Sequence, residues 1–180
     1  EGMNIKRIFY RFKQFRQAAK SHLTFTDVEF IRQYLTKPEQ VLFYRMRVFD
    51  QKHSLLTAQK FLERQAEYVW LDKNKFIRTA LMHDVGKACV RVPLYARCLF
   101  VFLGQVRDGA LLNAMAKEAT RWNFRKYLYV LRYHGEIGAK MLEEIEDDPE
   151  IIQVIRAHHH PPEVKESPLL PVIREMDNLV

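Results

Sequence analysis

The chain has 180 residues, a net charge of +7 and 28% charged residues. This length suits one domain with a substantial hydrophobic core. Its longest apolar run, Cys98 to Leu103, is far shorter than the roughly 20 residues that span a bilayer. The two cysteines have neither metal-ligand nor disulfide-framework spacing, so a disulfide-stapled secreted fold is excluded and we expect a cytoplasmic protein.

The first 20 residues contain most of the excess positive charge, with a balance of +5. Apolar residues recur at helical spacing between the basic ones, which predicts an amphipathic basic helix. Residues 5–20 could contact an anionic membrane or a nucleic acid. The alternative is a first helix that packs its apolar face on the domain behind it. We expect residues 1–49 to form this helix and a helical extension, ahead of one domain at residues 50–180.

Further along the chain, capping residues predict where helices begin. Glycine and proline are few, helix-forming residues are abundant, and no alternating strand pattern is visible. The fold class predicted is therefore all-α, a single compact helical bundle. The predicted starts are Lys37-Pro38-Glu39, Asp50 before the helix with His53, Asp72 before the helix that reaches His83, Asp148-Pro149-Glu150, and Ser167-Pro168. Pro161-Pro162 is predicted to end the helix that contains His158 to His160. Asp108-Gly109 is predicted to lie in a connection between two helices.

The segment RTALMHDVGK places His83 next to Asp84 at the end of an apolar helix. Burying either group without a partner costs several kcal/mol, so a protein hydrogen bond or a metal ion must satisfy them. Imidazoles and carboxylates together suit a divalent metal such as Fe, Mn, Co, Ni or Zn. Further candidate ligands lie on other predicted helices: His53, His134, His158, His159 and Asp177.

These residues, in this order, resemble the HD-domain superfamily of metal-dependent phosphohydrolases. The defining pattern of that superfamily is His, then His-Asp, then Asp. It is matched by His53 in DQKHSLLTAQ, by His83-Asp84 in ALMHDVGK and by Asp177 in REMDNL. The match covers about residues 50–180 and leaves residues 1–49 outside the motifs.

The chain is more similar to the branch of the superfamily with additional histidines. YHGEIGAKML resembles the His-x-x-Ile-Gly segment of that branch and supplies His134. VIRAHHHPP resembles its His-His segment and supplies His158 and His159. The alternative for any single one of these histidines is a core residue satisfied by a protein hydrogen bond.

The resemblance implies an all-helical domain that holds one or two divalent transition-metal ions. One ion would be bound by His53, His83, Asp84 and Asp177. A second would be bound by Asp84, His134 and His158, with His159 as an alternative or additional ligand. Two ions about 3.5–4 Å apart would lower the pKa of a bridging water, which would attack phosphorus in line.

Three residues after His83 have predicted roles, and for two of them the sequence leaves an alternative open. Asp84 is expected to be catalytic as the bridging carboxylate, and Lys87 is placed to add positive charge at the substrate phosphate. The alternative for Lys87 is a solvated lysine that complements the helix dipole. Gly86 would permit close approach of chain or substrate, or would simply end the helix.

Departures from related families narrow the substrate. HHHPPEVKESPLLP lacks the Asp-Gly-x-Gly-Tyr-Pro loop of the cyclic-dinucleotide phosphodiesterases, and no Glu-Asp pair follows Asp84 as in guanosine tetraphosphate hydrolases. We therefore expect a small phosphorylated substrate, a nucleotide or dinucleoside polyphosphate. The alternative is a non-catalytic module that senses a ligand or binds a partner.

Aromatic and basic residues before His134 could line a base-stacking pocket or form a core face: Arg121, Trp122, Phe124, Arg125, Lys126, Tyr127, Tyr129, Arg132 and Tyr133.

Overall fold

The computed structural model describes residues 22–105, 110–116, 124–145, 148–161 and 165–180. Over these residues the chain is all-α with no strand, as predicted. The predicted basic helix at residues 5–20 and the Asp108-Gly109 connection lie outside them. The elements are α2 (Phe25–Tyr34), α3 (Lys37–Arg45), α4 (Val48–Glu63), the 3-10 helix η1 (Gln65–Glu67), α5 (Lys73–Met82), the 3-10 helix η2 (Val85–Cys89), α6 (Leu94–Gln105), α7 (Ala110–Met115), α8 (Phe124–Glu143), α9 (Pro149–Ala157) and α10 (Leu169–Leu179).

Three helices begin where local capping residues predict. α3 has Pro38 in its first turn, and Glu39 completes a capping box with Thr36. Asp72 caps α5 by accepting a hydrogen bond from the backbone N–H of Lys75 at 3.0 Å. Asp148 caps α9 in the same way, with proline at the first helical position. Each cap satisfies N–H groups that have no partner inside the helix.

Two predicted starts are wrong in position. α4 begins at Val48, so Asp50 lies inside its first turn instead of capping it. Asp50 is fully buried there and pairs with Arg97, an interaction that outweighs a cap open to water. α10 begins at Leu169, after Ser167, although the Ser167 hydroxyl still accepts from the N–H of Leu169 at 3.1 Å.

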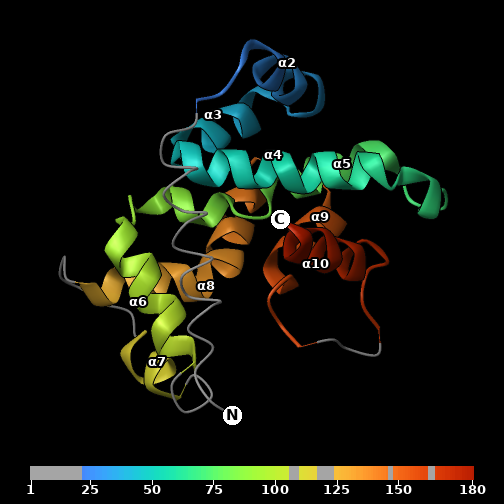
Figure 1. Ribbon diagram of the computed structural model, residues 1–180. Helices are drawn as coiled ribbons and strands as arrows, with labels where there is room; N and C mark the ends of the chain where they lie inside the picture. Colours follow the sequence, from blue (N-terminus) through green and yellow to red (C-terminus); the bar gives the residue numbers. More distant parts are fainter. Residues whose placement is uncertain (1–21, 106–109, 117–123, 146–147, 162–164) are drawn as a thin grey trace.

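The main hydrophobic core lies between α4 and α5 on one side and α9 and α10 on the other. In Figure 1, α4 and α5 run across the upper half of the molecule, below α2 and α3. α9 and α10 lie beneath α5, and α6 and α7 lie at the lower left. Ile31 of α2 and Phe43 of α3 belong to the same core as Phe61 and Phe76. α2 and α3 therefore pack on the domain, and the division at residues 49 and 50 stays a prediction.

Close contacts at two glycines hold α8 against its neighbours. A Cβ at Gly86 would lie 1.9 Å from the carbonyl oxygen of His134, so the η2 backbone touches the α8 backbone there. A Cβ at Gly135 would lie 2.8 Å from the carbonyl oxygen of Ile155 in α9. Of the alternatives for Gly86, close approach of the chain is the one observed. Among the described residues, no helix combines the length and apolarity needed to cross a membrane.

Candidate metal centre

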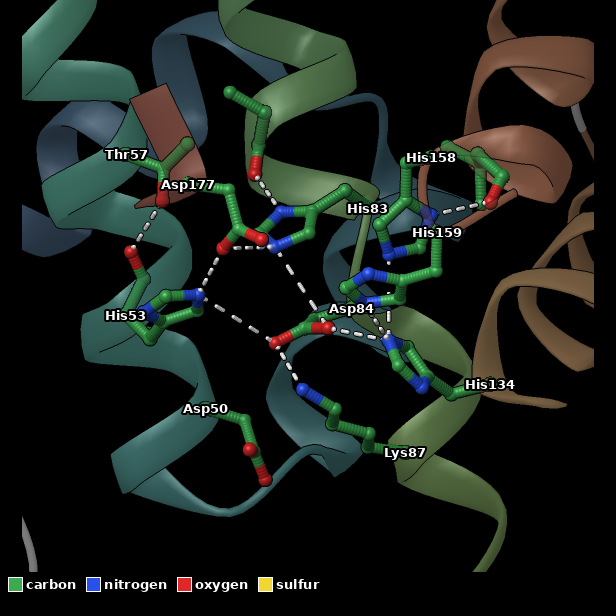
Figure 2. A network of polar contacts seen from close by, with 12 residues as sticks. Asp50, His53, Thr57, His83, Asp84, Lys87, His134, His158, His159 and Asp177 are labelled. Atoms are coloured by element: carbon green, nitrogen blue, oxygen red, sulfur yellow. Dashed lines mark hydrogen bonds and ion pairs between the residues drawn. The ribbon is translucent and has the colours of Figure 1, made fainter. Parts of the chain in front are cut away.

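The predicted site residues come together in one cluster, although they come from segments spread over most of the chain (Figure 2). α4 contributes His53, the end of α5 contributes His83, and α8 contributes His134. Asp84 lies just before η2, and Lys87 lies within it. The end of α9 supplies His158 and His159, and α10 supplies Asp177.

Three of the histidines are oriented by the same local hydrogen bond to the backbone. The Nδ1 atoms of His83, His134 and His158 lie 2.8, 2.9 and 2.6 Å from the carbonyl oxygen three residues earlier. A carbonyl oxygen can only accept, so each Nδ1 carries the proton and donates it. In the neutral imidazole, Nε2 then keeps its lone pair, and this is the tautomer that binds a metal ion through Nε2.

These carbonyls are accessible because the helices end or bend at the histidines. His83 and His158 are the C-caps of α5 and α9, where the last carbonyls have no partner inside the helix. His134 lies in the interior of α8, but Tyr133 just before it has a non-helical backbone, with φ −114° and ψ 18°. The kink gives His134 the local geometry of a helix end.

One set of ligands, which we call the three-histidine group, consists of Asp84, His134, His158 and His159. His134 Nε2 lies 3.0 Å from Asp84 Oδ1, 3.3 Å from His158 Nε2 and 3.0 Å from His159 Nε2. Asp84, His134 and His158 are buried, whereas His159 reaches in from the surface. The ring nitrogens and the carboxylate oxygen therefore converge on one small volume.

The second set, the two-histidine group, consists of His53, His83, Asp84 and Asp177. His53 Nε2 lies 2.7 Å from Asp177 Oδ1 and 4.0 Å from Asp84 Oδ2. His83 Nε2 lies 3.5 Å from Asp177 Oδ1 and 3.7 Å from Asp84 Oδ1. Asp84 thus belongs to both groups, with its two oxygens facing different histidines.

The chemistry of these donors fits divalent cations. Among the described residues, His83 Nε2 and Asp84 Oδ1 are buried without a hydrogen-bond partner. An unsatisfied buried polar atom costs about 1–3 kcal/mol, more if charged. In the three-histidine group, the Nε2 lone pairs of His134 and His158 face each other and Asp84 Oδ1 with no proton between them. A cation placed there would satisfy all three.

The pKa shifts in the three-histidine group keep its imidazoles neutral near pH 7. Burial, followed by the positive charge of Lys87, lowers the pKa of His134. Burial, followed by the neighbouring imidazole of His159, holds the pKa of His158 well below its ordinary value. Neutral imidazoles are the form that binds metal.

The two-histidine group shows the opposite shift. Burial lowers the pKa of His83, but Asp84 and Asp177 outweigh it and raise that pKa to about 9. Burial raises the pKa of both carboxyl groups, but Lys87 and His83 hold that of Asp84, and His53 and His83 that of Asp177, well below the ordinary range. The two carboxylates therefore stabilise positive charge on His83, and a metal cation bound there would have to displace the His83 proton.

A cavity of about 520 Å³ opens beside both groups. Lys87 lines it, with Nζ 2.6 Å from Asp84 Oδ2, so its charge lies at the site and not in open solvent. Of the aromatic and basic residues before His134, Arg132 lines the cavity. Tyr127 and Tyr129 pack instead on a small core cluster, and Arg121 and Trp122 lie outside the described residues.

Several cavity residues were missed by sequence reasoning. Phe49, Phe100 and Arg97 are among the residues that line it. Arg97 is only 6% exposed, binds both oxygens of Asp50 at 2.8 and 2.7 Å, and lies over the ring of Phe49 at 5.1 Å. An arginine within the apolar helix of residues 94–105 was a signal that it pairs inside the protein. Its partner, 47 residues away, left no local signal.

Comparison with known proteins gives one match. A protein-family model described as HD domain matches residues 51–180, which is more than half of the chain. Comparison with curated proteins and with solved structures finds no match. The matched range contains all seven residues of the two ligand groups.

Proposed function

The chain belongs to the HD-domain family, and from this premise we propose that it is a metal-dependent phosphohydrolase acting on a small phosphoester, a nucleotide. Members of the family are generally metal-dependent hydrolases, and the described residues include a His/Asp cluster able to hold metal. The observation that carries the proposal is the convergence of Nε2 and carboxylate lone pairs on two adjoining groups that share Asp84.

We assign one ion to the two-histidine group and a second to the three-histidine group, with Fe, Mn, Co, Ni and Zn as the candidate metals. When bound, such ions supply a water of lowered pKa and positive charge for phosphoryl oxygens. The residues of the chain hold the centre in shape. Asp84 joins the two groups, and the carbonyls behind His83, His134 and His158 fix the direction of each lone pair.

Lys87 is the residue we assign to the substrate phosphate. Its side chain is 14% exposed and faces the cavity, where Nζ contacts Asp84 Oδ2. An ammonium group in a partly enclosed site can donate to a phosphoryl oxygen and offset the charge that develops there. Arg132, which also lines the cavity, adds a second positive charge.

The volume and lining of the cavity support a nucleotide as the substrate. Its volume of about 520 Å³ falls in the usual range for small-molecule sites. Its lining combines apolar side chains, among them Phe49 and Phe100, with residues of the ligand groups and Lys87. A planar base would pack on the apolar side chains while its phosphate meets the ligand groups and Lys87.

Metal content measured by inductively coupled plasma mass spectrometry tests the centre. We expect close to two equivalents per chain in the parent, and loss in both His83→Ala and His134→Ala. His160→Ala is the matched control, because His160 is exposed beside the site and pairs with Glu136 at 3.4 Å. It should keep the parent content. A parent that binds no metal after reconstitution would refute the proposal.

Phosphate release from a panel of nucleoside mono-, di- and triphosphates and a dinucleoside polyphosphate tests the reaction. We expect Lys87→Met to lower kcat about 100-fold while metal content stays unchanged, as for loss of one charge-stabilising donor. Tight metal binding without turnover on any phosphoester would instead support the non-catalytic ligand-sensing module.

A further inference from the structure

Arg174 ties the helix that carries Asp177 to the turn that carries His158. It lies on α10, one helical turn before Asp177. Its Nε donates to the carbonyl oxygen of His158 at 3.2 Å, and its Nη2 donates to those of Ala157 at 3.2 Å and His160 at 3.0 Å. One guanidinium thus holds three carbonyls at the end of α9.

The carbonyls at a helix C-terminus have no partners inside the helix, and a positive charge there is favoured by the helix dipole. In α9 they belong to the turn from which His158 and His159 project into the three-histidine group. If the turn unwinds, both imidazoles shift relative to Asp84. The capping guanidinium therefore controls where two of the four ligands lie.

Arg174 is itself held in place. Its Nη1 donates to both carboxylate oxygens of Glu166, at 3.0 and 2.9 Å, and both side chains are less than one-fifth exposed. A planar guanidinium can bind a carboxylate on one edge while its other N–H groups reach separate carbonyls. A lysine at this position could not make all these contacts, because its ammonium is a single point of charge.

We propose that Arg174 is a positioning residue that fixes the position of the three-histidine group relative to the two-histidine group. α10 supplies Asp177 to the second group and, through Arg174, braces the α9 turn of the first. Since Asp84 must reach both groups, their separation decides whether two ions can be held together. This inference rests on the metal binding proposed above but not on phosphoester hydrolysis.

The test uses full-length parent, Arg174→Gln, Arg174→Lys and Arg156→Gln, titrated with Co²⁺ and followed by calorimetry and by the visible absorption of the bound ion. Arg156→Gln is the matched control, because Arg156 lies on α9, the helix whose end Arg174 caps, and pairs with Glu143 at the surface. In Arg174→Gln we expect the ion of the three-histidine group to bind 10- to 100-fold more weakly, roughly the effect of losing an outer support of a metal ligand. Its absorption band should change, while the other ion keeps its affinity.

Arg174→Lys should recover part of the lost affinity, since it keeps the positive charge but fewer hydrogen bonds. This partial rescue and the loss of one ion alone would not follow from a general loss of stability. Parent affinity for both ions in Arg174→Gln would overturn the inference, as would equal weakening of both ions. A parent that binds no Co²⁺ would overturn the metal centre itself, and a parent that binds two ions without turnover would overturn only the hydrolase.

Discussion

The substitution Gly86→Ala tests the close contact between η2 and α8. The added Cβ would lie 1.9 Å from the carbonyl oxygen of His134, whereas real Cβ contacts essentially never fall below 3.0 Å. The next nearest atoms, Gly138 N at 2.7 Å and His134 C at 2.8 Å, are also backbone, so no side chain can swing away. α8 must retreat by about 1.1 Å or η2 must deform. Overpacking of this kind costs roughly 1–3 kcal/mol, and more where the backbone must shift.

Urea unfolding of the metal-free protein, followed by circular dichroism, measures this loss. We expect Gly86→Ala to lower the free energy of unfolding by about 3 kcal/mol. It should also weaken metal binding at the three-histidine group, since His134 moves with α8. Gly104→Ala is the control: Gly104 is within α6, and its added Cβ would lie 3.8 Å from a methyl of Leu112, an ordinary contact. There we expect stabilisation of up to about 1 kcal/mol, because alanine favours helix. A Gly86→Ala protein as stable as the parent would refute the reasoning.

Three further predictions concern other contacts. Asp50→Asn or Arg97→Met alone should each lower the free energy of unfolding in urea by about 3–5 kcal/mol, because the remaining buried charge loses its partner. The double substitution should recover most of that loss, and additive losses would contradict this prediction. Burial raises the pKa of Asp148, but hydrogen bonds from Lys75 and two backbone N–H groups outweigh it and lower that pKa. The stabilisation is therefore present above the unfolded-state pKa and is lost as pH falls through the folded-state value, so Asp148→Ala should cost about 1 kcal/mol at pH 7 and less below about pH 4; a loss independent of pH would count against it. Adding a binding metal to chelator-treated protein at about 100 times its Kd should raise the unfolding free energy by about 2.7 kcal/mol, and His83→Ala should reduce this gain.

Much of the secondary structure was predictable because the deciding interactions are local. The capping interactions at Thr36, Asp72 and Asp148 each join residues two or three positions apart, so at most four adjacent letters of sequence contain the whole interaction. The family pattern identified the residues that the tertiary structure brings together around Asp84. The predicted start at Asp50 was wrong because a capping residue and a buried ion-pair partner are the same type of residue in a sequence.

The sequence by itself therefore determined that the chain is helical, where several helices begin and which histidines and carboxylates are candidate metal ligands. The tertiary structure decided how those groups face one another. Three contacts depend on the packing of segments 14 to 52 residues apart: Arg97 with Asp50, Gly86 with the α8 backbone, and Arg174 with the end of α9. Helical periodicity carries no information on such pairings, because it specifies which face of a helix is buried but not which helix covers it.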